Sequence, residues 1–152
     1  GWGGGFDGPI QHQGRQGTKG TKVIGPGPEV DAVARHIIDA AFEAHRALGS
    51  GLLESVYEQC LAHELELKGI RVERQVTVPV AYRGLQFEAG FRMDMLVGGT
   101  VVVEVKAVET ALPVHTAQLL TYLRLSGHRL GLLINFNVPL IKHGIRRLIA
   151  PD

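Results

Sequence analysis

The stretch Asp94-Met-Leu-Val-Gly-Gly-Thr-Val-Val-Val-Glu-Val-Lys106 decides the fold of this 152-residue chain. It contains an acidic residue, a glycine turn, and then a carboxylate and a lysine that close an all-valine strand. A continuous valine run is typical of a buried strand, where an uncompensated charge is costly to desolvate. A divalent cation reached by Asp94 and Glu104 together, with Lys106 beside it, would supply the compensation.

The register of the hairpin decides whether Asp94 and Glu104 share a face of the sheet. A two-residue glycine turn would put them on opposite faces, because side chains alternate along a strand. A three-residue loop, Gly98 to Thr100 with one glycine in the left-handed region, pairs Val97 with Val101 instead. Asp94 then lies opposite Glu104. We predict that loop or an equivalent bulge, and a separation of roughly 4.5 to 5.5 Å between the two Cβ atoms.

Helical and strand periodicities divide the rest of the chain. Helices are expected over residues 30–48, 52–68 and 113–126, and strands over 72–82, 85–97, 101–106 and 130–136, with 141–149 as a last strand or a short helix. Pro79 indicates an edge strand or a bulge. Gly69 and Gly127 are expected to end helices. This order predicts an α/β fold with a mixed central sheet of four to five strands flanked by helices.

Residues 1–28 differ from the rest of the chain. They contain ten glycines and three prolines and show no periodicity, so we expect a disordered tail. Residues 29–152 are then one domain. Cys60 is the single cysteine and excludes an internal disulfide, which favours a reducing, cytoplasmic location. No apolar stretch has the length of a membrane span, so no membrane partner is expected.

The net charge of +1 points to no partner, but the charges are unevenly distributed. Residues 29–109 carry thirteen acidic and eight basic side chains. Residues 110–151 carry five basic side chains and no acidic one: Arg124, Arg129, Lys142, Arg146 and Arg147. They form either a basic face or a set of solvated surface arginines and lysine.

The chemistry of the central motif follows from its oxygen donors. Oxygen-only ligands favour Mg²⁺ or Mn²⁺, and the Val105 carbonyl is a further candidate ligand. Two carboxylates close together repel each other unless a cation lies between them or one stays protonated. Lys106 would orient or deprotonate the attacking water, or stabilise charge growing on a phosphate. The simpler interpretation is a surface glutamate–lysine pair at a strand end.

Two helix motifs strengthen the catalytic interpretation. In Gly51-Leu-Leu-Glu54-Ser-Val-Tyr57, a glycine precedes a helix whose first turn points Glu54 outward, with Tyr57 on the same side. In Gln118-Leu-Leu-Thr-Tyr122, two polar side chains lie one helical turn apart. The alternatives are a carboxylate near a helix dipole and a polar helix face that includes a tyrosine. The seven histidines form no zinc motif.

With these motifs in this order, the chain resembles the GxxExxY proteins over roughly residues 37–148. That family is similar to a small branch of the PD-(D/E)XK nuclease superfamily, in the RecB-type motif style. The resemblance implies an αβββαβ core of restriction-endonuclease type. It also implies site residues: Glu54, Asp94 and Glu104 as metal ligands, Lys106 as the catalytic lysine, and Gln118 and Tyr122 as residues that contact the substrate backbone or support the site. Tyr57 and Arg124 are further candidates for contact with the substrate.

Two functions from different classes remain open. In the first, the chain is a Mg²⁺- or Mn²⁺-dependent nuclease that hydrolyses phosphodiester bonds of nucleic acid, DNA in particular, with phosphate contacts from the C-terminal arginines. In the second, the same fold is a catalytically inactive module that binds nucleic acid or protein. Three carboxylates converging on one solvent-open point would favour the enzyme, whereas a Lys106 ammonium between the carboxylates would favour the inactive module.

Overall fold

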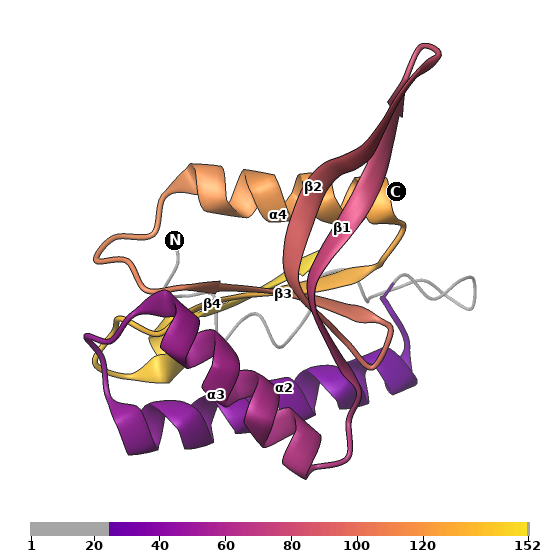
Figure 1. Cartoon of the computed structure of the whole chain (residues 1–152). Helices are drawn as coiled ribbons and strands as arrows, with labels where there is room; N and C mark the ends of the chain where they lie inside the picture. The colour runs from indigo at the N-terminus through magenta and orange to yellow at the C-terminus, as the bar shows by residue number, and fades with distance from the viewer. Residues whose placement is uncertain (1–24, 152) are drawn as a thin grey trace.

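The computed structural model describes residues 25–151, in which five strands form one mixed sheet in the order β1-β2-β3-β4-β5. The elements are α2 (Pro28–Leu48), α3 (Glu54–Leu67), β1 (Val72–Tyr82), β2 (Leu85–Val97), β3 (Val101–Lys106), α4 (Pro113–Ser126), β4 (Leu130–Asn135), η2 (Ile141–Gly144) and β5 (Ile145–Ile149). Helices α2 and α3 cover one face of the sheet and α4 covers the other (Figure 1). The predicted α/β class and the αβββαβ core are confirmed.

The observed helices and strands differ from the predicted ones mainly in the residues at which they begin and end. Helix α2 already begins at Pro28, because a proline is well suited to the first helical position. For residues 141–149 the sequence predicted either a strand or a short helix. The structure has both, a short 3-10 helix followed by strand β5. Of the tail expected over residues 1–28, residues 1–24 lie outside the described part of the chain, as does residue 152. No helix between residues 25 and 151 combines the length and apolarity that crossing a bilayer requires.

Strands β3 and β4 are the centre of the sheet and are buried on both faces. They run parallel, joined by the α4 crossover, and all six residues of β4 are buried. Such double burial explains the nearly unbroken aliphatic sequence of both strands. Their side chains contribute to two separate hydrophobic cores, one on each face of the sheet. One lies under α2 and α3 and includes Ile37, Leu61, Val103 and Phe136; the other lies under α4 and includes Val102, Leu119, Leu123 and Leu133.

The loop between β2 and β3 has the predicted register. Val97 pairs with Val101, and the ladder continues to Met95 opposite Val103. Both glycines, rather than one, have positive φ: 61° at Gly98 and 73° at Gly99. Asp94 and Glu104 are therefore the next residues facing each other across the two strands, and the separation of their Cβ atoms stays a prediction.

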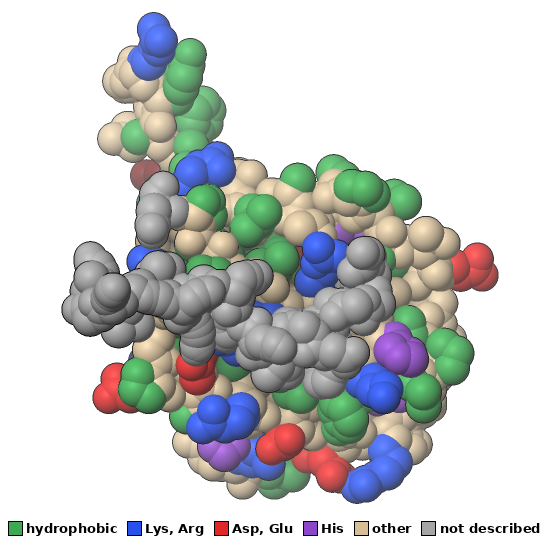
Figure 2. Space-filling model, turned by 180° about the vertical axis from the view of Figure 1, so that it is seen from behind, with side chains coloured by type: hydrophobic (Ala, Val, Ile, Leu, Met, Phe, Trp, Pro, Cys, Tyr) green, Lys and Arg blue, Asp and Glu red, His purple; other side chains and the backbone are tan. Residues whose placement is uncertain are grey.

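The far half of the β1–β2 hairpin projects beyond the body of the protein (Figure 1). Pro79 lies on the edge strand at an irregularity in the pairing, between Val78 and Val80, as the sequence predicted. From residue 81 to residue 90 every residue is exposed, including Tyr82 and Phe87. Seen from behind, hydrophobic and basic side chains lie along this arm (Figure 2).

At its base the hairpin is bent. Arg74 pairs with Met95 and Val76 pairs with Met93, but the intervening residues, Gln75 and Asp94, are not a ladder pair. Met95 packs into the α2–α3 core, whereas Met93, two residues earlier, packs into the α4 core. Since residues two apart in a regular strand share a face, β2 rotates at Asp94. The bend therefore lies at the first residue of the candidate site.

Candidate active site

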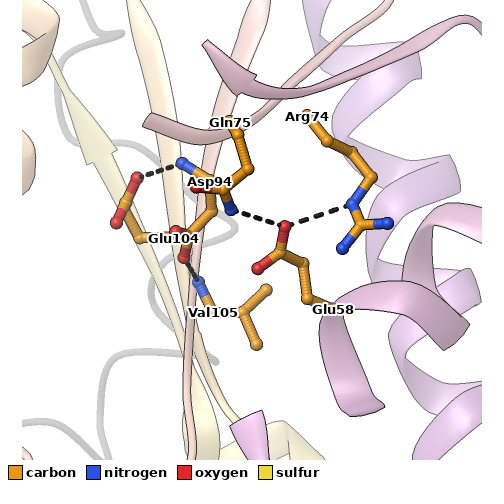
Figure 3. A network of polar contacts seen from close by, with 6 residues as sticks. All are labelled: Glu58, Arg74, Gln75, Asp94, Glu104 and Val105. Atoms are coloured by element: carbon orange, nitrogen blue, oxygen red, sulfur yellow. Dashed lines mark hydrogen bonds and ion pairs between the residues drawn. The ribbon is translucent and has the colours of Figure 1, made fainter. Parts of the chain in front are cut away.

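The carboxyl groups of Asp94 and Glu104 interlock across β2 and β3 (Figure 3). Glu104 Oε2 accepts a hydrogen bond from the Asp94 amide at 2.9 Å. Asp94 Oδ2 accepts one from the Val105 amide at 2.8 Å. Each acidic side chain is thus held by the backbone of the opposite strand. Reciprocal bonds of this kind fix both carboxyl groups at the open end of the β2–β3 ladder.

The electrostatic environment of this pair disfavours two negative charges. Burial, and then the negative charge of Asp94, raise the pKa of Glu104 from 4.5 to about 8. Burial is also the main cause that raises the pKa of Asp94, with Glu58 and Glu54 contributing in the same direction. Glu104 is only 6% exposed. The site is therefore short of positive charge at neutral pH.

Lys106 is near the pair but does not neutralise it. Its charge lowers the pKa of both Asp94 and Glu104, yet within residues 25–151 its ammonium group makes no ion pair with either. The ammonium does not occupy the position between the carboxylates that would have favoured an inactive module. Lys106 lies two residues beyond Glu104 on β3 and is half-buried.

Asn135 at the end of β4 fastens the chain that leaves Lys106. The buried Asn135 amide donates to the Val108 carbonyl at 2.9 Å and accepts from the Val108 amide at 3.0 Å. The Lys106 carbonyl accepts from the Phe136 amide at 2.9 Å. These bonds hold the end of β3 and the start of the connection to α4 against β4. This role of Asn135 was not foreseen from the sequence.

Helix α3 brings two glutamates toward the pair. Glu54 is the first residue of α3 and is exposed, as predicted. Its negative charge contributes to the raised pKa of Asp94. Glu58, one turn further along α3, is 6% exposed. Its negative charge contributes to the raised pKa of both Asp94 and Glu104. Sequence reasoning missed Glu58. The available indication was its spacing of four residues from Glu54, which places both on one side of the helix.

The predicted convergence of three carboxylates on one centre is not present in this arrangement. Among the residues described, no group of three or more His, Cys, Asp or Glu side chains is placed to hold a metal ion. One oxygen of Asp94 and one oxygen of Glu104 are each directed at a backbone amide of the opposite strand. Val105 enters as an amide donor, and its carbonyl as a ligand stays a prediction.

Tyr57 has a different environment from the predicted substrate contact. Its side chain is fully buried and stacks on Phe136 with ring centroids 4.6 Å apart. Its hydroxyl donates to the Gly49 carbonyl at 2.6 Å and accepts from the Leu52 amide at 3.1 Å. The hydroxyl thereby closes the loop that leads into α3. In this position Tyr57 does not reach a substrate, and its role is to fix the helix that carries Glu54.

Replacing Tyr57 with phenylalanine should lower the free energy of unfolding by about 1 to 3 kcal/mol, because two backbone groups lose their partner. The ring and its packing on Phe136 are kept. Urea denaturation of Tyr57→Phe beside Tyr82→Phe, a change at an exposed tyrosine, measures the difference. Equal stability of the two variants would show that the hydroxyl does not hold the loop.

Helix α4 carries the residues predicted on the substrate side. The half-buried Tyr122 stacks on Phe91 of β2 at 4.4 Å, and the charges of Glu104 and Asp94, after burial, raise its pKa. The structure therefore brings Tyr122 close to the acidic pair. Gln118, one turn earlier, and Arg124 are exposed on the same helix. Neither makes a contact that assigns it to the pair.

The donor set fits a hard divalent cation. Two carboxyl groups are held close together, where their negative charges repel each other, and Lys106 leaves a deficit of positive charge. Oxygen ligands of this kind suit Mg²⁺ or Mn²⁺ better than zinc. Asp94 and Glu104 would hold such an ion once their oxygens turn from the backbone amides, with Glu54 within electrostatic reach.

Comparison with known proteins identifies the family of the chain. The sequence profile described as the PD-(D/E)XK nuclease superfamily matches residues 31–148. The chain belongs to the PD-(D/E)XK nuclease superfamily. The match includes every site residue discussed above and all five strands of the sheet except the last residue of β5. Members of this superfamily are typically metal-dependent and act on nucleic acid.

One solved structure supports the fold assignment. The chain is similar to the protein in the crystal structure of SSO0001, with a TM-score of 0.51 and 19% sequence identity. The similarity covers 82% of this chain and 61% of that one, so the present chain spans less than two thirds of its length. At this identity the likeness concerns the fold. No curated protein matches the chain.

Proposed function

We propose that this PD-(D/E)XK protein is a Mg²⁺- or Mn²⁺-dependent nuclease of the GxxExxY type that hydrolyses DNA phosphodiester bonds, with the cytoplasm as its location. The observation that carries the proposal is the interlocked pair of Asp94 and Glu104 beside Lys106. These three side chains lie just beyond the last paired residues of β2 and β3, and the pair is electrostatically unfavourable without a cation. A purely structural strand end has no physical reason to bury such a pair.

The roles follow from position and charge. Asp94 and Glu104 hold the cation, which supplies Lewis-acid activation of the phosphorus centre when bound. Lys106 lies on the same strand as Glu104, and its ammonium orients the attacking water or balances the negative charge that develops on the phosphate. Because it forms no ion pair with either carboxylate in the described chain, Lys106 is available for that contact.

The substrate side is formed by α4. Gln118 and Arg124 are exposed on this helix. Burial, and then the charges of the acidic pair, raise the pKa of Tyr122 on the same helix. Amide and guanidinium groups are common donors to phosphate oxygens, so we assign Gln118 and Arg124 to the nucleic-acid backbone. Tyr122 supports the site from the side, because its ring is packed against Phe91. Such contacts position a strand without reading its sequence.

A second candidate is an inactive nucleic-acid- or protein-binding module on the same fold. It is favoured by the orientation of the two carboxyl groups, each of which is satisfied by a backbone amide instead of sharing a centre with a third acidic side chain. The two candidates differ in one measurable property, cleavage that depends on a divalent cation.

Incubation of the purified protein with single- and double-stranded DNA tests the proposal. Cleavage is expected with Mg²⁺ or Mn²⁺ and should stop on addition of EDTA. Lys106→Met should reduce the rate by roughly 10²- to 10³-fold, since it removes a charge aimed at the transition state. Lys68→Met, a change at the exposed lysine that follows α3, is the matched control. Cleavage that survives EDTA, or that is equal in the two variants, would reject the proposed mechanism.

A further inference from the structure

Glu58 is a buried carboxylate for which the proposed mechanism has no use. It lies on α3 and faces β1, where its Oε2 accepts hydrogen bonds from Gln75 Nε2 at 2.9 Å and Arg74 Nε at 3.2 Å (Figure 3). Its exposure of 6% equals that of Glu104. Burying a carboxylate is expensive unless it is paired and hydrogen-bonded. Both partners of Glu58 belong to one short segment of β1.

That segment contains the bend of the hairpin. Gln75 has a positive φ of 54°, which a residue with a Cβ atom rarely adopts inside a strand. Such a conformation is strained and persists only when the surroundings hold it. The hydrogen bond from the Gln75 side chain to Glu58 is the contact that the structure offers for this purpose.

Asp94 lies directly across the strands from Gln75. The regular pairing resumes on both sides of these two residues, so the left-handed turn at Gln75 and the rotation of β2 at Asp94 are the same bend. Without the bend, Asp94 would alternate regularly between Met93 and Met95, which now face opposite cores. The bend therefore decides where the Asp94 amide and carboxyl group point.

We infer that Glu58 is a positioning residue that places Asp94 through Gln75. The inference rests on the proposed function for its link to a cation, but its structural part stands independently. Glu58 holds the left-handed conformation of Gln75, the bend rotates β2, and the Asp94–Glu104–Val105 bonds form as a result. Partners that orient the ligands of a metal typically affect its affinity 10- to 100-fold.

Substitutions at Glu58 and Gln75 separate this role from direct coordination by Glu58. Glu58→Ala removes the acceptor, whereas Glu58→Gln keeps an oxygen for Gln75 and loses the charge. Gln75→Ala breaks the same contact from an exposed position, so folding is not at risk. Gln75→Gly adopts positive φ without support, and in combination with Glu58→Ala it should restore the bend. Glu66→Ala, at an exposed glutamate of α3, is the control.

Two readouts are needed, one of which requires neither metal nor substrate. Hydrogen exchange of the Asp94 and Val105 amides in the metal-free protein reports the bend. Calorimetric titration with MnCl₂ reports cation affinity. We expect Glu58→Ala and Gln75→Ala to accelerate exchange at both amides and to weaken Mn²⁺ binding about 10- to 100-fold. Glu58→Gln and the double variant with Gln75→Gly should remain near wild type in both measurements, as should the control.

The opposite results overturn the inference. If Glu58→Ala leaves exchange at both amides unchanged, Glu58 does not hold the bend. If Glu58→Gln loses Mn²⁺ as strongly as Glu58→Ala, and glycine at position 75 rescues neither, Glu58 is a ligand instead of a positioning residue. A wild-type protein that binds no Mn²⁺ would reject the proposed function, and amide exchange would still decide the role of Glu58.

Discussion

Asp94→Asn should lower the rate of Mg²⁺-dependent DNA cleavage by at least about 10³-fold, because a charged metal ligand contributes several kcal/mol to transition-state stabilisation. The asparagine oxygen can still accept from the Val105 amide, which preserves the β2–β3 contact seen in the protein. The loss should therefore appear in the rate and in cation affinity, while the protein stays folded. Cleavage rates measured over a range of Mg²⁺ concentrations provide the comparison.

Asp39→Asn is the matched control, since Asp39 is an exposed aspartate on α2 outside the site. Wild-type and Asp39→Asn rates should agree within a factor of about two. If Asp94→Asn cleaves DNA as fast as the control, Asp94 is not a ligand. If it is inactive but also unfolded at the assay temperature, Asp94→Glu, which retains the charge, replaces it; full activity of that variant would agree with ligation.

The second large effect concerns Glu104 and pH. The pKa of Glu104 is raised from 4.5 to about 8, so between these values the folded protein retains a proton that the unfolded chain releases. The contribution of Glu104 to the unfolding free energy of the metal-free protein should therefore be largest below pH 4.5. It should decrease as the pH rises from 4.5 through about 8. The raised pKa of Asp94 acts in the same direction.

Glu104→Gln carries no titrating proton and should remove most of this pH dependence. At pH 8 in EDTA, the variant should exceed the wild type in unfolding free energy by roughly 1 to 3 kcal/mol, while it loses cleavage. Urea denaturation at pH 5, 6.5 and 8 measures the effect, with Glu66→Gln as the control. Parallel pH profiles for wild type and Glu104→Gln would contradict the electrostatic account of the site.

Much of the fold could be predicted from the β3 sequence. A strand of valines with a carboxylate at its end has to be central and buried, and a glycine pair before it restricts the register to few choices. The observed pairing of Val97 with Val101 is the one that brings Asp94 and Glu104 together. Local composition therefore determined both the sheet and the pairing of the two acidic residues.

The bend at Gln75 and Asp94, and the contact with Glu58 that supports it, could not be predicted from the sequence. A positive φ is anticipated at glycine, and Gln75 gives no such indication, because its conformation depends on Glu58 from a helix that precedes it in the chain. Tyr57 was misjudged for a related reason. Its spacing from Glu54 predicts a shared side of α3, but spacing does not show that Phe136 and the Gly49 carbonyl enclose the ring and hydroxyl.

The orientation of the carboxyl groups was also not predictable. Sequence reasoning considered a cation or a shared proton as the ways to relieve two close carboxylates. It did not consider the backbone amides of the opposite strand, which become available only because the ladder ends at Met95 and Val103. The point at which the pairing of β2 with β3 ends thus determines where the side chains of Asp94 and Glu104 are directed.

The most direct test of the cation-dependent site is a crystal structure determined from protein soaked in MnCl₂, with anomalous scattering used to locate manganese. We predict a single strong site with carboxyl oxygens of Asp94 and Glu104 at about 2.1 to 2.3 Å, both turned away from the Val105 and Asp94 amides. Manganese bound elsewhere, or a map without a peak while both carboxyl groups keep their backbone hydrogen bonds, would contradict the account.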